Sequence, residues 1–433
     1  MAIKVGMVSL GCSKNQVDAE ILLALMLENG YEICADPQQC DVVIINTCGF
    51  IEDAKKESIF EFAQLKNEGQ VKVLVVTGCL AERYQDQLVS EIPEADVVLG
   101  IGKNTEIAKA VKEALDGHRV AAFGDKADLP LNGDRVLSTE KYSAYLKIAE
   151  GCDNRCSFCA IPLIRGGYRS RRMEDILEEA RGLAESGVKE LNLVAQDTTK
   201  YGQDLYGEYA LDKLLTELCK IDGFHWIRVL YGYPDRVTDG LLEVMAREPK
   251  VVKYIDLPLQ HASGRVLKEM NRKGDFDSLC ALMQKIRDKV PGVVLRTTFI
   301  TGFPGETDED FEQTLKLVQD TRFDLLFTFL YSPRTGTPAA SYEDNATPQD
   351  KQRRFERLLK AQDEIVAEKQ AAYQGRKLRL LVDGNAKGSE YPVTARTEGN
   401  LLVFVRGDDI KIGEFIEAEI EKTSLRCLFA HKL

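Results

Sequence analysis

Residues 151–162 read GCDNRCSFCAIP, and this stretch places Cys152, Cys156 and Cys159 on one short loop with the spacing C-x3-C-x2-C. Three thiolates so spaced can hold three corners of a cubane 4Fe–4S cluster, whereas the clusters of ferredoxins are held by four cysteines. A set of three leaves one iron open for another ligand, just as catalytic zinc sites keep an open position. The loop therefore indicates a cluster whose fourth iron binds something other than cysteine.

A zinc site is the main alternative for this loop. Structural zinc takes four Cys or His ligands. The nearest downstream candidates, Cys219 and His225, lie some sixty residues away. The spacing therefore favours an iron–sulfur cluster over zinc.

The composition indicates a multidomain protein. Of the 433 residues, 44% are hydrophobic, which is ample for two or three packed domains. No apolar run approaches the about 18–20 residues that a membrane span requires, and the first residues, MAIKVGMVSLGC, resemble a strand rather than a signal peptide. Eleven cysteines in a chain of this length fit a reducing compartment better than a disulfide scaffold. We therefore expect a cytoplasmic protein without a membrane segment.

The net charge of −12 is unevenly distributed. Residues 1–137 carry 13 Lys and Arg against 22 Asp and Glu, residues 138–375 carry 34 against 38, and residues 376–433 carry 10 against 9. Proteins that bind nucleic acid normally present a basic face, because affinity comes largely from neutralising phosphates. An acidic protein suits a basic partner, since opposite fields speed encounter. Nucleic acid is therefore not expected as the primary substrate.

Residues 1–117 alternate the patterns of buried strands and amphipathic helices. This alternation predicts a doubly wound α/β domain of flavodoxin-like or Rossmann-like size. The predicted strands are Val5–Leu10, Val42–Ile45, Val71–Thr77 and Val97–Leu99, and the predicted helices are Gln16–Glu28, Glu52–Lys66, Ala81–Glu91 and Asn104–Leu115.

Three further cysteines, Cys12, Cys48 and Cys79, each follow one of the first three predicted strands. Because the carboxyl ends of parallel strands share one edge of a sheet, we expect these cysteines to converge. Each has a neighbouring glycine, which permits the backbone to approach a ligand closely. The repeated placement favours a second three-cysteine cluster over three buried cysteines that act as small hydrophobes.

Residues 138–346, after a linker at 118–137, repeat the strand–helix pattern six times. Six βα units in order predict a partial TIM-type (β/α)6 barrel with its site at the carboxyl ends of the strands. The three-cysteine loop follows the first of these strands, where that rule places it. The predicted strands are Ala144–Ala149, Leu191–Ala195, Trp226–Tyr231, Tyr254–Leu257, Val293–Ile300 and Leu325–Tyr331.

The rest of the chain predicts a connector and a small domain. Residues 347–375 have the pattern of one charged amphipathic helix. Residues 376–433 contain short alternating runs that are typical of a small antiparallel β-barrel.

The loop at Cys152, with Phe158 before its last cysteine, resembles the signature of radical S-adenosylmethionine enzymes. The order of a three-cysteine α/β domain, a radical domain and a C-terminal barrel resembles the methylthiotransferase family over essentially the whole chain. In that family the barrel is called TRAM. The resemblance implies two 4Fe–4S clusters, a radical-generating one that binds S-adenosylmethionine and an auxiliary one. The implied ligands are Cys152, Cys156 and Cys159 for the first cluster and Cys12, Cys48 and Cys79 for the second.

Several strings resemble the branch of this family that modifies an aspartate of the small-subunit ribosomal protein S-twelve. They are SLGCSKNQVDAE, AYLKIAEGCDNRCSFCAIPLIRGGYRSR, VAQDTTKYG and YIDLPLQHAS. The other branch modifies adenosine in transfer RNA. In place of SLGCSKNQVDAE and YIDLPLQHAS, that branch usually has sequences closer to YGCQMN and PVQSGS. The arginine in YSPRTGTPA, at Tyr331–Ala339, fits either branch.

The implied reaction inserts sulfur and a methyl group at the β-carbon of the aspartate, giving 3-methylthioaspartate. One S-adenosylmethionine supplies the methyl group, and another is reductively cleaved to a 5′-deoxyadenosyl radical that removes a hydrogen. The electron would come from a low-potential donor such as flavodoxin or ferredoxin. The alternative within the family is methylthiolation of a tRNA adenosine.

Four further residues are candidates for binding S-adenosylmethionine. Gln196 and Asp197 follow the second barrel strand at the catalytic rim, although a helix cap explains the aspartate equally well. Gly302 and Gly305, in the run TGFPGET, permit close backbone approach to a ligand, although a plain strand–helix turn explains them nearly as well.

Four arginines follow the cysteine loop and can orient an acidic group such as the substrate aspartate. A salt-bridged, solvated helix entry is the commoner role for such a group. They are Arg165, Arg169, Arg171 and Arg172.

Two other classes of protein compete with an enzyme. A two-cluster electron carrier would leave the six βα units and the C-terminal barrel without a role. A zinc-stabilised scaffold would contain no iron. The order of domains therefore favours an enzyme.

Overall fold

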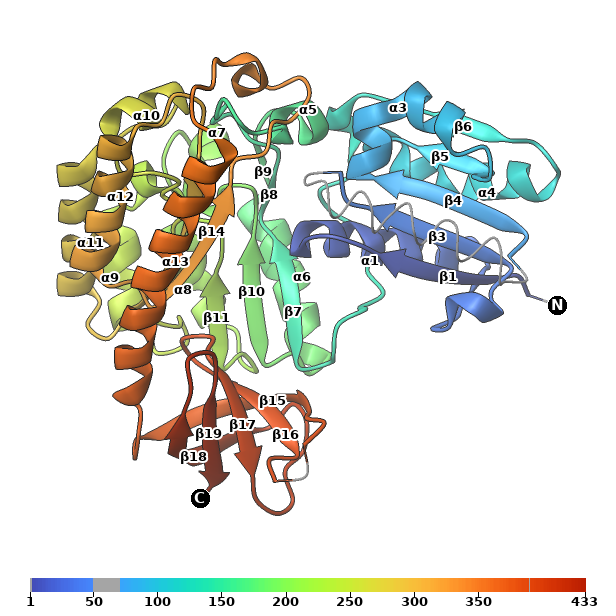
Figure 1. Ribbon diagram of the computed structural model, residues 1–433. Coiled ribbons are helices and arrows are strands. Elements are labelled where there is room, and N and C mark those ends of the chain that lie inside the picture. The colour runs from blue at the N-terminus through green and yellow to red at the C-terminus, as the bar shows by residue number, and fades with distance from the viewer. Residues whose placement is uncertain (1, 50–70, 389) are drawn as a thin grey trace.

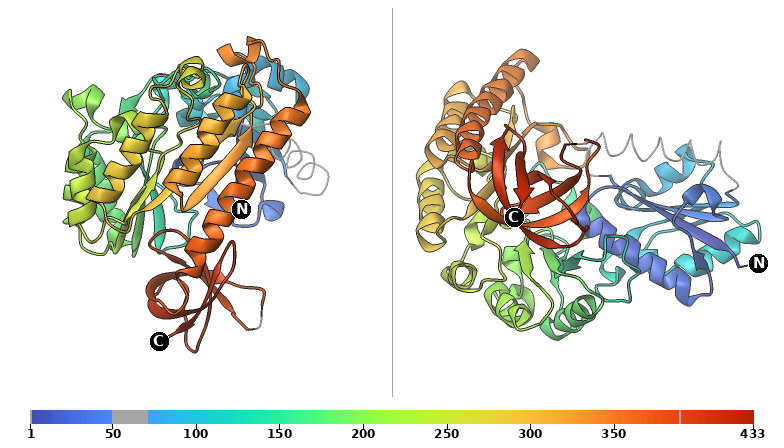
Figure 2. Two further views of the ribbon diagram at one scale, coloured as in Figure 1. Left: turned by 60° about the vertical axis from the view of Figure 1, so that its left-hand side comes forward. Right: turned by 90° about the horizontal axis from the view of Figure 1, so that it is seen from below.

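A computed structural model describes residues 2–49, 71–388 and 390–433 (Figure 1). An N-terminal α/β domain lies beside a central barrel of parallel strands, and a small β-barrel packs against one end of the central barrel (Figure 2). The predicted helix at 52–66 lies outside the described residues. None of the described helices is both long enough and apolar enough to cross a membrane.

The N-terminal domain contains a six-stranded, all-parallel sheet in the order β2-β1-β3-β4-β5-β6. The first five strands have the flavodoxin-like order. The strands are β1 (Lys4–Ser9), β2 (Glu32–Ile33), β3 (Val42–Thr47), β4 (Val73–Gly78), β5 (Val97–Leu99) and β6 (Val120–Ala122), and the helices are α1 (Ser13–Glu28), α3 (Cys79–Glu91) and α4 (Ile107–Leu115).

Helices cover both faces of this sheet. Leu22 of α1 and Val111 of α4 pack on one face, and Leu88 of α3 packs on the other. The doubly wound fold is therefore confirmed. The sheet also contains two short strands that the sequence pattern did not predict, and one of them, β6, lies beyond residue 117, where we expected the domain to end.

The central barrel contains six parallel strands in two sets of three, ordered β11-β10-β7 and β12-β13-β14. A bridge between Ile227 and Val251 joins the two sets. The strands are β7 (Ser143–Lys147), β10 (Glu190–Val194), β11 (Trp226–Val229), β12 (Tyr254–Asp256), β13 (Val294–Thr301) and β14 (Leu325–Leu330). The predicted six-stranded partial barrel is confirmed.

Helices surround the outside of these strands, and together they enclose the largest apolar core of the chain. A short hairpin of β8 (Ala149–Glu150) and β9 (Arg169–Ser170) follows β7. The helices are α5 (Ile161–Arg165), α6 (Met173–Glu185), α7 (Gln203–Tyr206), α8 (Leu211–Cys219), α9 (Asp239–Arg247), α10 (Gly264–Glu269), α11 (Phe276–Lys289) and α12 (Asp308–Thr321).

Helix α13 (Pro348–Ala371) connects the central barrel to the C-terminal barrel. It begins with a capping box between Thr347 and Asp350, and Pro348 occupies its first turn, where a missing N–H costs nothing. The closed C-terminal barrel has the order β15-β16-β17-β19-β18. Its strands are β15 (Lys377–Asn385), β16 (Val393–Thr397), β17 (Leu402–Arg406), β18 (Phe415–Thr423) and β19 (Leu428–Lys432). One pair, β17 and β19, is parallel, so this barrel is not purely antiparallel.

The C-terminal barrel packs against the amino ends of the central strands. Trp226, the first residue of β11, makes an edge contact with Phe415 at a ring distance of 4.8 Å. The Tyr142 hydroxyl, just before β7, donates to the carbonyl of Asp383 at 2.9 Å. The opposite rim, formed by the carboxyl ends of the strands, faces the N-terminal domain and carries the cysteine loop.

Candidate functional site

The loop from Gly151 to Ala160 connects β8 to α5. Gly151 has φ +76°, and a Cβ there would lie 2.0 Å from the carbonyl oxygen of Gly167, so only glycine fits. Further along, the N–H of Cys159 donates to the carbonyl of Cys156 at 3.0 Å. Backbone contacts therefore fix the loop that carries three of the predicted cluster ligands.

The cysteines of the N-terminal domain lie at the ends of neighbouring strands. Cys12 precedes α1, Cys48 follows β3, and Cys79 begins α3. A Cβ at Gly11 would lie 3.1 Å from Sγ of Cys48, and a Cβ at Gly49 would lie 3.0 Å from the carbonyl carbon of Cys79. The three loops therefore converge as predicted, and these two glycines allow the loops to pack closely on one another.

All six cysteines line a single cavity of about 1040 Å³ between the N-terminal domain and the central barrel. This volume lies just above the usual range of ligand pockets, about 300–1,000 Å³. The other lining residues that bear on the site are Lys14, Asn15, Asn154, Arg155, Arg165, Gln196, Tyr231, Tyr233, Gln260 and Arg272. Two cysteine sets 73 or more residues apart in sequence therefore meet across one space.

Within the described ranges, no three His, Cys, Asp or Glu side chains are arranged to hold a single metal ion. A cubane attaches each cysteine to a separate iron, so its ligands stand farther apart than the ligands of one ion. Three soft sulfur donors on each side of the cavity are the ligand type that iron–sulfur clusters use. The donor set therefore fits two clusters better than an isolated ion.

A buried group of four charges joins the two domains beside the cavity. Asp18 on α1 accepts from Nζ of Lys147 and from Nη1 of Arg165, both at 2.5 Å. Glu150 on β8 accepts from the same two cations at 2.9 and 3.4 Å. Burial raises the pKa of Glu150, but Lys147 and Arg165 outweigh burial and lower it to about 2. Two cations thus balance two carboxylates, and the group carries no net charge.

Arg165 extends this network to the cysteines. Its Nη2 donates to Sγ of Cys79 at 3.3 Å and to Oδ1 of Asn15 at 3.0 Å. Across the cavity, Nη1 of Arg272 lies 3.6 Å from Sγ of Cys156. Each cysteine set therefore has one guanidinium in hydrogen-bond contact with a sulfur.

The thiols of the cavity differ in acidity. Burial raises the pKa of Cys79 and of Cys159 to about 11 and that of Cys152 to about 12. Cys12 borders open space on one side, and burial on its protein side raises its pKa. The cations of Lys14 and Arg165 more than offset that burial, so the pKa of Cys12 lies below its ordinary value. Metal binding must therefore displace protons from most of these thiols.

Of the two predicted ligands that follow the second barrel strand, only Gln196 lines the cavity. Its Nε2 donates to Oε1 of Glu150 at 2.6 Å, while its buried Oε1 has no hydrogen-bond partner in the described chain. Asp197 instead caps the short 3-10 helix Thr198–Lys200 and accepts from Asn154 at 2.9 Å. The amide oxygen of Gln196 is thus an acceptor available to a ligand, and Asp197 has the capping role that we gave as its alternative.

Gly302 and Gly305 do not line the cavity. Both have positive φ, and a Cβ at Gly302 would lie 2.7 Å from the Lys351 side chain of α13. The N–H of Gly302 donates to Glu306 at 2.6 Å, and Thr307 caps α12. This geometry is that of a strand–helix turn, and a role of these glycines in binding S-adenosylmethionine stays a prediction.

The four arginines past the loop have different surroundings. Arg165 and Arg171 are buried, and Arg171 pairs with a carboxylate of α6 at 2.7 Å. Arg169 donates to backbone carbonyls of the linker between the domains. Arg172 alone, at the entry to α6, forms an exposed pair, with Asp175 at 2.7 Å. The solvated helix entry that we considered the commoner role therefore describes only Arg172.

The lining residues that sequence reasoning missed include Lys14, Tyr231, Tyr233 and Arg272. Nζ of Lys14 lies 3.3 Å from the centroid of the Tyr231 ring, and the Arg272 guanidinium lies 4.2 Å from that of Tyr233. The sequence contained one indication of a site role for the two tyrosines, which is their position: both follow a strand that ends at the catalytic rim.

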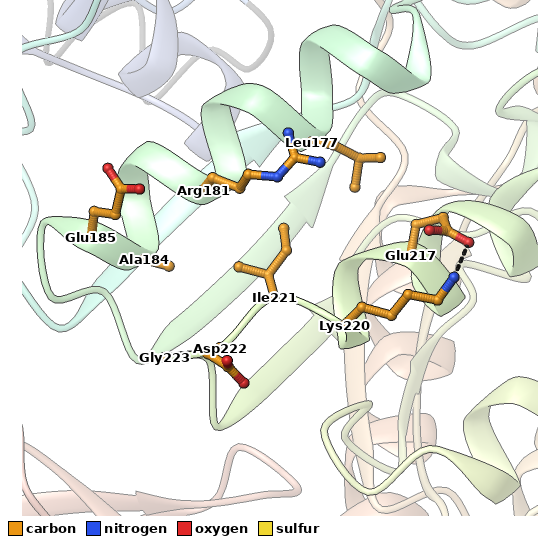
Figure 3. Close-up of a pocket in the computed structure, with 9 residues that line it drawn as sticks. All are labelled: Leu177, Arg181, Ala184, Glu185, Glu217, Lys220, Ile221, Asp222 and Gly223. Atoms are coloured by element: carbon orange, nitrogen blue, oxygen red, sulfur yellow. Dashed lines mark hydrogen bonds and ion pairs between the residues drawn. The ribbon is translucent and has the colours of Figure 1, made fainter.

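A second hollow of about 640 Å³ lies on the outer surface between α6 and α8 (Figure 3). Its polar side chains include Arg181 and Glu185 of α6 and the pair Glu217–Lys220, whose charged atoms lie 2.6 Å apart. It contains neither cysteine nor histidine. The chemistry of its lining therefore favours the six-cysteine cavity as the reaction site.

Three family models match successive parts of the chain. Residues 4–100 match the uncharacterized protein family UPF0004, residues 146–318 match the radical SAM superfamily, and residues 371–433 match the TRAM domain. Among solved structures, the radical S-adenosylmethionine methyltransferase TsrM from Kitasatospora setae matches with a TM-score of 0.60 and 12% identity, over 78% of this chain and 74% of that chain. The cobalamin-dependent S-adenosylmethionine radical enzyme OxsB matches with a TM-score of 0.53 and 14% identity, over 85% of this chain and 56% of that chain. These two likenesses show the fold alone.

Curated relatives match nearly the whole chain. The ribosomal protein uS12 methylthiotransferase RimO of Clostridioides difficile is 44% identical, with 96% of each chain covered. The protein of the same name from Pelotomaculum thermopropionicum is 46% identical, with 97% of each chain covered. Another from an Anaeromyxobacter species is 45% identical, over 98% of this chain and 92% of the relative. The chain belongs to the RimO family of radical SAM methylthiotransferases.

Proposed function

We propose that this chain is an S-adenosylmethionine-dependent methylthiotransferase. Its substrate is an aspartate of ribosomal protein uS12, and its product is 3-methylthioaspartate. The observation that carries the proposal is the convergence of six cysteines, three from each of two domains, on one cavity. A reaction that joins a sulfur atom to an unactivated carbon needs the radical source and the sulfur source to face the same target atom.

Two 4Fe–4S clusters and S-adenosylmethionine fit this cavity. Cys152, Cys156 and Cys159 would hold one cluster, and Cys12, Cys48 and Cys79 would hold the other. Each set of three thiols leaves one iron of its cluster without a cysteine. When bound, these groups supply reductive cleavage of S-adenosylmethionine, sulfur and a methyl group.

The chain's own residues bind, orient and shield the reactants. Arg165 and Arg272 donate N–H groups to Cys79 and Cys156, and hydrogen bonds to ligand sulfurs tune the potential of a cluster. The unpartnered amide oxygen of Gln196 accepts a hydrogen bond from a bound reactant. The buried ionic junction holds the two cavity walls at a fixed separation, which keeps the target carbon between them.

The remaining partners follow from this chemistry. Cleavage of S-adenosylmethionine consumes an electron, so we assign a low-potential donor such as flavodoxin or ferredoxin. A ribosomal protein is basic, which suits the acidic N-terminal region. A ribosomal substrate also implies a cytoplasmic reaction.

Mass spectrometry on an anaerobic reaction tests the proposal. The reaction contains cluster-loaded enzyme, S-adenosylmethionine, sulfide, a strong reductant and, in separate tubes, purified uS12 or bulk tRNA. The expected result is that one aspartate of uS12 gains the mass of a methylthio group in place of hydrogen. The same gain on an adenosine would reassign the substrate to tRNA. Deoxyadenosine without either product would retain the radical chemistry and reject both substrates.

A further inference from the structure

Lys14 is a buried cation that faces the six-cysteine cavity. It lies in the first turn of α1, two residues past Cys12, and only 8% of its surface is exposed. Among the described residues its ammonium group forms no ion pair and donates no hydrogen bond. It lies 3.3 Å from the centroid of the Tyr231 ring, and the Cys12 thiol and the Glu150 carboxylate attract it electrostatically without an ion-pair contact. A buried ammonium needs a counter-charge or acceptors to offset lost hydration. This geometry therefore indicates an anionic ligand.

Tyr231 holds the ammonium in place from the opposite domain. Its backbone has φ +61°, a conformation that a bulky residue rarely adopts. Thr198 holds this turn, because its N–H donates to the carbonyl of Tyr231 at 3.1 Å and its hydroxyl is shared between the carbonyls of Leu230 at 2.8 Å and Tyr231 at 3.2 Å. Strain of this kind persists where the surrounding structure enforces it, and it is concentrated at functional sites. The strained turn places an aromatic face, which attracts cations, beneath Lys14.

The other cations of the cavity already have partners or lie at its edge. Arg165 is paired with Asp18 and Glu150. Arg272 donates to the carbonyl of Pro258 at 2.6 Å and stacks on Tyr233. Arg155 is exposed and lies on the cysteine loop.

The nearby carboxylates are also occupied. Both Glu150 and Asp18 are bound by Lys147 and Arg165. Asp256 is paired with Arg296 at 2.6 Å. Among the described residues, Lys14 is therefore the cation of this cavity that is buried and has no direct ion-pair or hydrogen-bond partner.

We propose that the ammonium group of Lys14 binds the side-chain carboxylate of the target aspartate. This inference rests on the proposed function and deepens it by assigning the residue that selects an aspartate. A carboxylate that enters a cavity loses its hydration, and a fixed ammonium within hydrogen-bond reach compensates for that loss. Because the β-carbon is bonded to this carboxylate, the contact also fixes the carbon that reacts. Lys14 is thus a substrate-binding residue and does not transfer a group itself.

S-adenosylmethionine is the other source of a carboxylate in this cavity, so the test separates the two sources. Binding of uS12 to the cluster-loaded enzyme is measured without reductant and in the presence of S-adenosylmethionine, so that no turnover occurs. The probes are uS12 and its variant with the target aspartate changed to asparagine. The enzymes are wild type, Lys14→Met, Lys14→Gln and, as a matched cation on the same cavity, Arg155→Met.

We expect wild type to bind the aspartate form about 10–100-fold more tightly than the asparagine form, which is the range for a charged hydrogen bond. Lys14→Met and Lys14→Gln should lose most of this ratio, whereas Arg155→Met should keep it. The dissociation constant for S-adenosylmethionine should be unchanged in both Lys14 variants. Iron content and the visible spectrum of each enzyme establish that both clusters are loaded before binding is measured.

Three results would overturn the inference. They are equal binding of the two uS12 forms by wild type, an undiminished ratio in both Lys14 variants, or weaker binding of S-adenosylmethionine with the uS12 ratio intact. The first of these needs no variant, so the inference can fail even if Lys14→Met does not fold. Methylthiolation of uS12 by the wild-type enzyme is measured separately. Its absence would reject the proposed function. Its presence, together with an unchanged binding ratio in the Lys14 variants, would reject only the role of Lys14.

Discussion

Nη2 of Arg165, on the central barrel, donates a hydrogen bond to Sγ of Cys79, on the N-terminal domain, over 3.3 Å. The same guanidinium is paired with Asp18 and Glu150, so one buried side chain connects a predicted cluster ligand to the ionic junction between the domains. The distance between the two cysteine sets therefore depends on a rigid, charge-balanced contact.

Replacing Arg165 by methionine should destabilise this junction. Methionine has a similar length but leaves Asp18 and Glu150 with Lys147 as their remaining ionic partner. Breaking a buried ion pair costs about 3–5 kcal/mol. We expect the free energy of unfolding, measured by urea titration with circular dichroism, to fall by that amount, and iron uptake to fall with it.

Arg172→Met is the matched control, because Arg172 forms an exposed pair with Asp175. Such pairs contribute about 0–1 kcal/mol. Equal stability losses in the Arg165 and Arg172 variants would show that the junction does not hold the domains together.

Cysteine variants should separate the two halves of the reaction. Cys156→Ala removes a predicted ligand of the radical-generating cluster and should abolish deoxyadenosine formation. Cys48→Ala removes a predicted ligand of the other cluster, so it should keep some deoxyadenosine formation and lose the methylthio product. Each variant should contain about half of the wild-type iron, because one of two four-iron clusters is lost. Iron analysis and product chromatography measure both effects.

Cys219→Ala is the control for these variants, because Cys219 lies at the end of α8, outside the cavity. Its iron content and product should match wild type. A full methylthio yield from Cys48→Ala would contradict the assignment of the N-terminal cysteines.

The long strands, their order along the chain and the convergence of the cysteines could be predicted, because each depends on local periodicity or on the shared edge of a parallel sheet. The short strands β2 and β6 could not, because two or three residues show no periodicity. The partners of Arg165 could not. Asp18 lies 147 residues and Cys79 lies 86 residues away, and no spacing rule indicates which surfaces of two domains will meet. Lys14 and Tyr231 escaped notice for the same reason, since their contact crosses that interface. The glycines of TGFPGET were ambiguous for a different reason, because a strand–helix turn and a ligand-binding loop use the same residue type.

Substituting Tyr231 should reveal the strain in its backbone. At φ +61°, glycine is free of the steric cost that alanine bears, which is about 1–2 kcal/mol. Tyr231→Gly should therefore be more stable than Tyr231→Ala by about 1 kcal/mol in urea unfolding. Both should bind uS12 more weakly, since neither supports Lys14.

Tyr233 provides the opposite case two residues later. Its φ is −119°, so glycine there brings only its entropic cost, and Tyr233→Gly should be less stable than Tyr233→Ala. The same order of stability at both positions would mean that the turn at Tyr231 is not strained.

Glu190 should make the attachment of the C-terminal barrel depend on pH. This buried carboxylate on β10 pairs with Arg396 of β16 at 2.7 Å and with Arg228 of β11 at 3.1 Å. Burial raises its pKa, but the two guanidiniums outweigh burial and hold the pKa below its ordinary value. A lowered carboxylate pKa gives stability that is present above about pH 4.3, the unfolded value, and is lost as pH falls through the folded value. Glu190→Gln should therefore reduce the free energy of unfolding by about 1.5–3 kcal/mol at pH 7, and the difference from wild type should shrink below about pH 4.

The single tryptophan of the chain makes this measurement specific to the junction. Trp226 packs edge-on against Phe415 of the C-terminal barrel, so its fluorescence changes when that barrel separates from the central one. Glu217→Gln is the control, because Glu217 forms an exposed pair with Lys220 and should give no pH-dependent difference. If the gap between wild type and Glu190→Gln stayed constant from pH 7 to below pH 4, the ionised form of Glu190 would not be what stabilises the junction. The packing of Trp226 against Phe415 would then carry that stability, because apolar contact does not titrate.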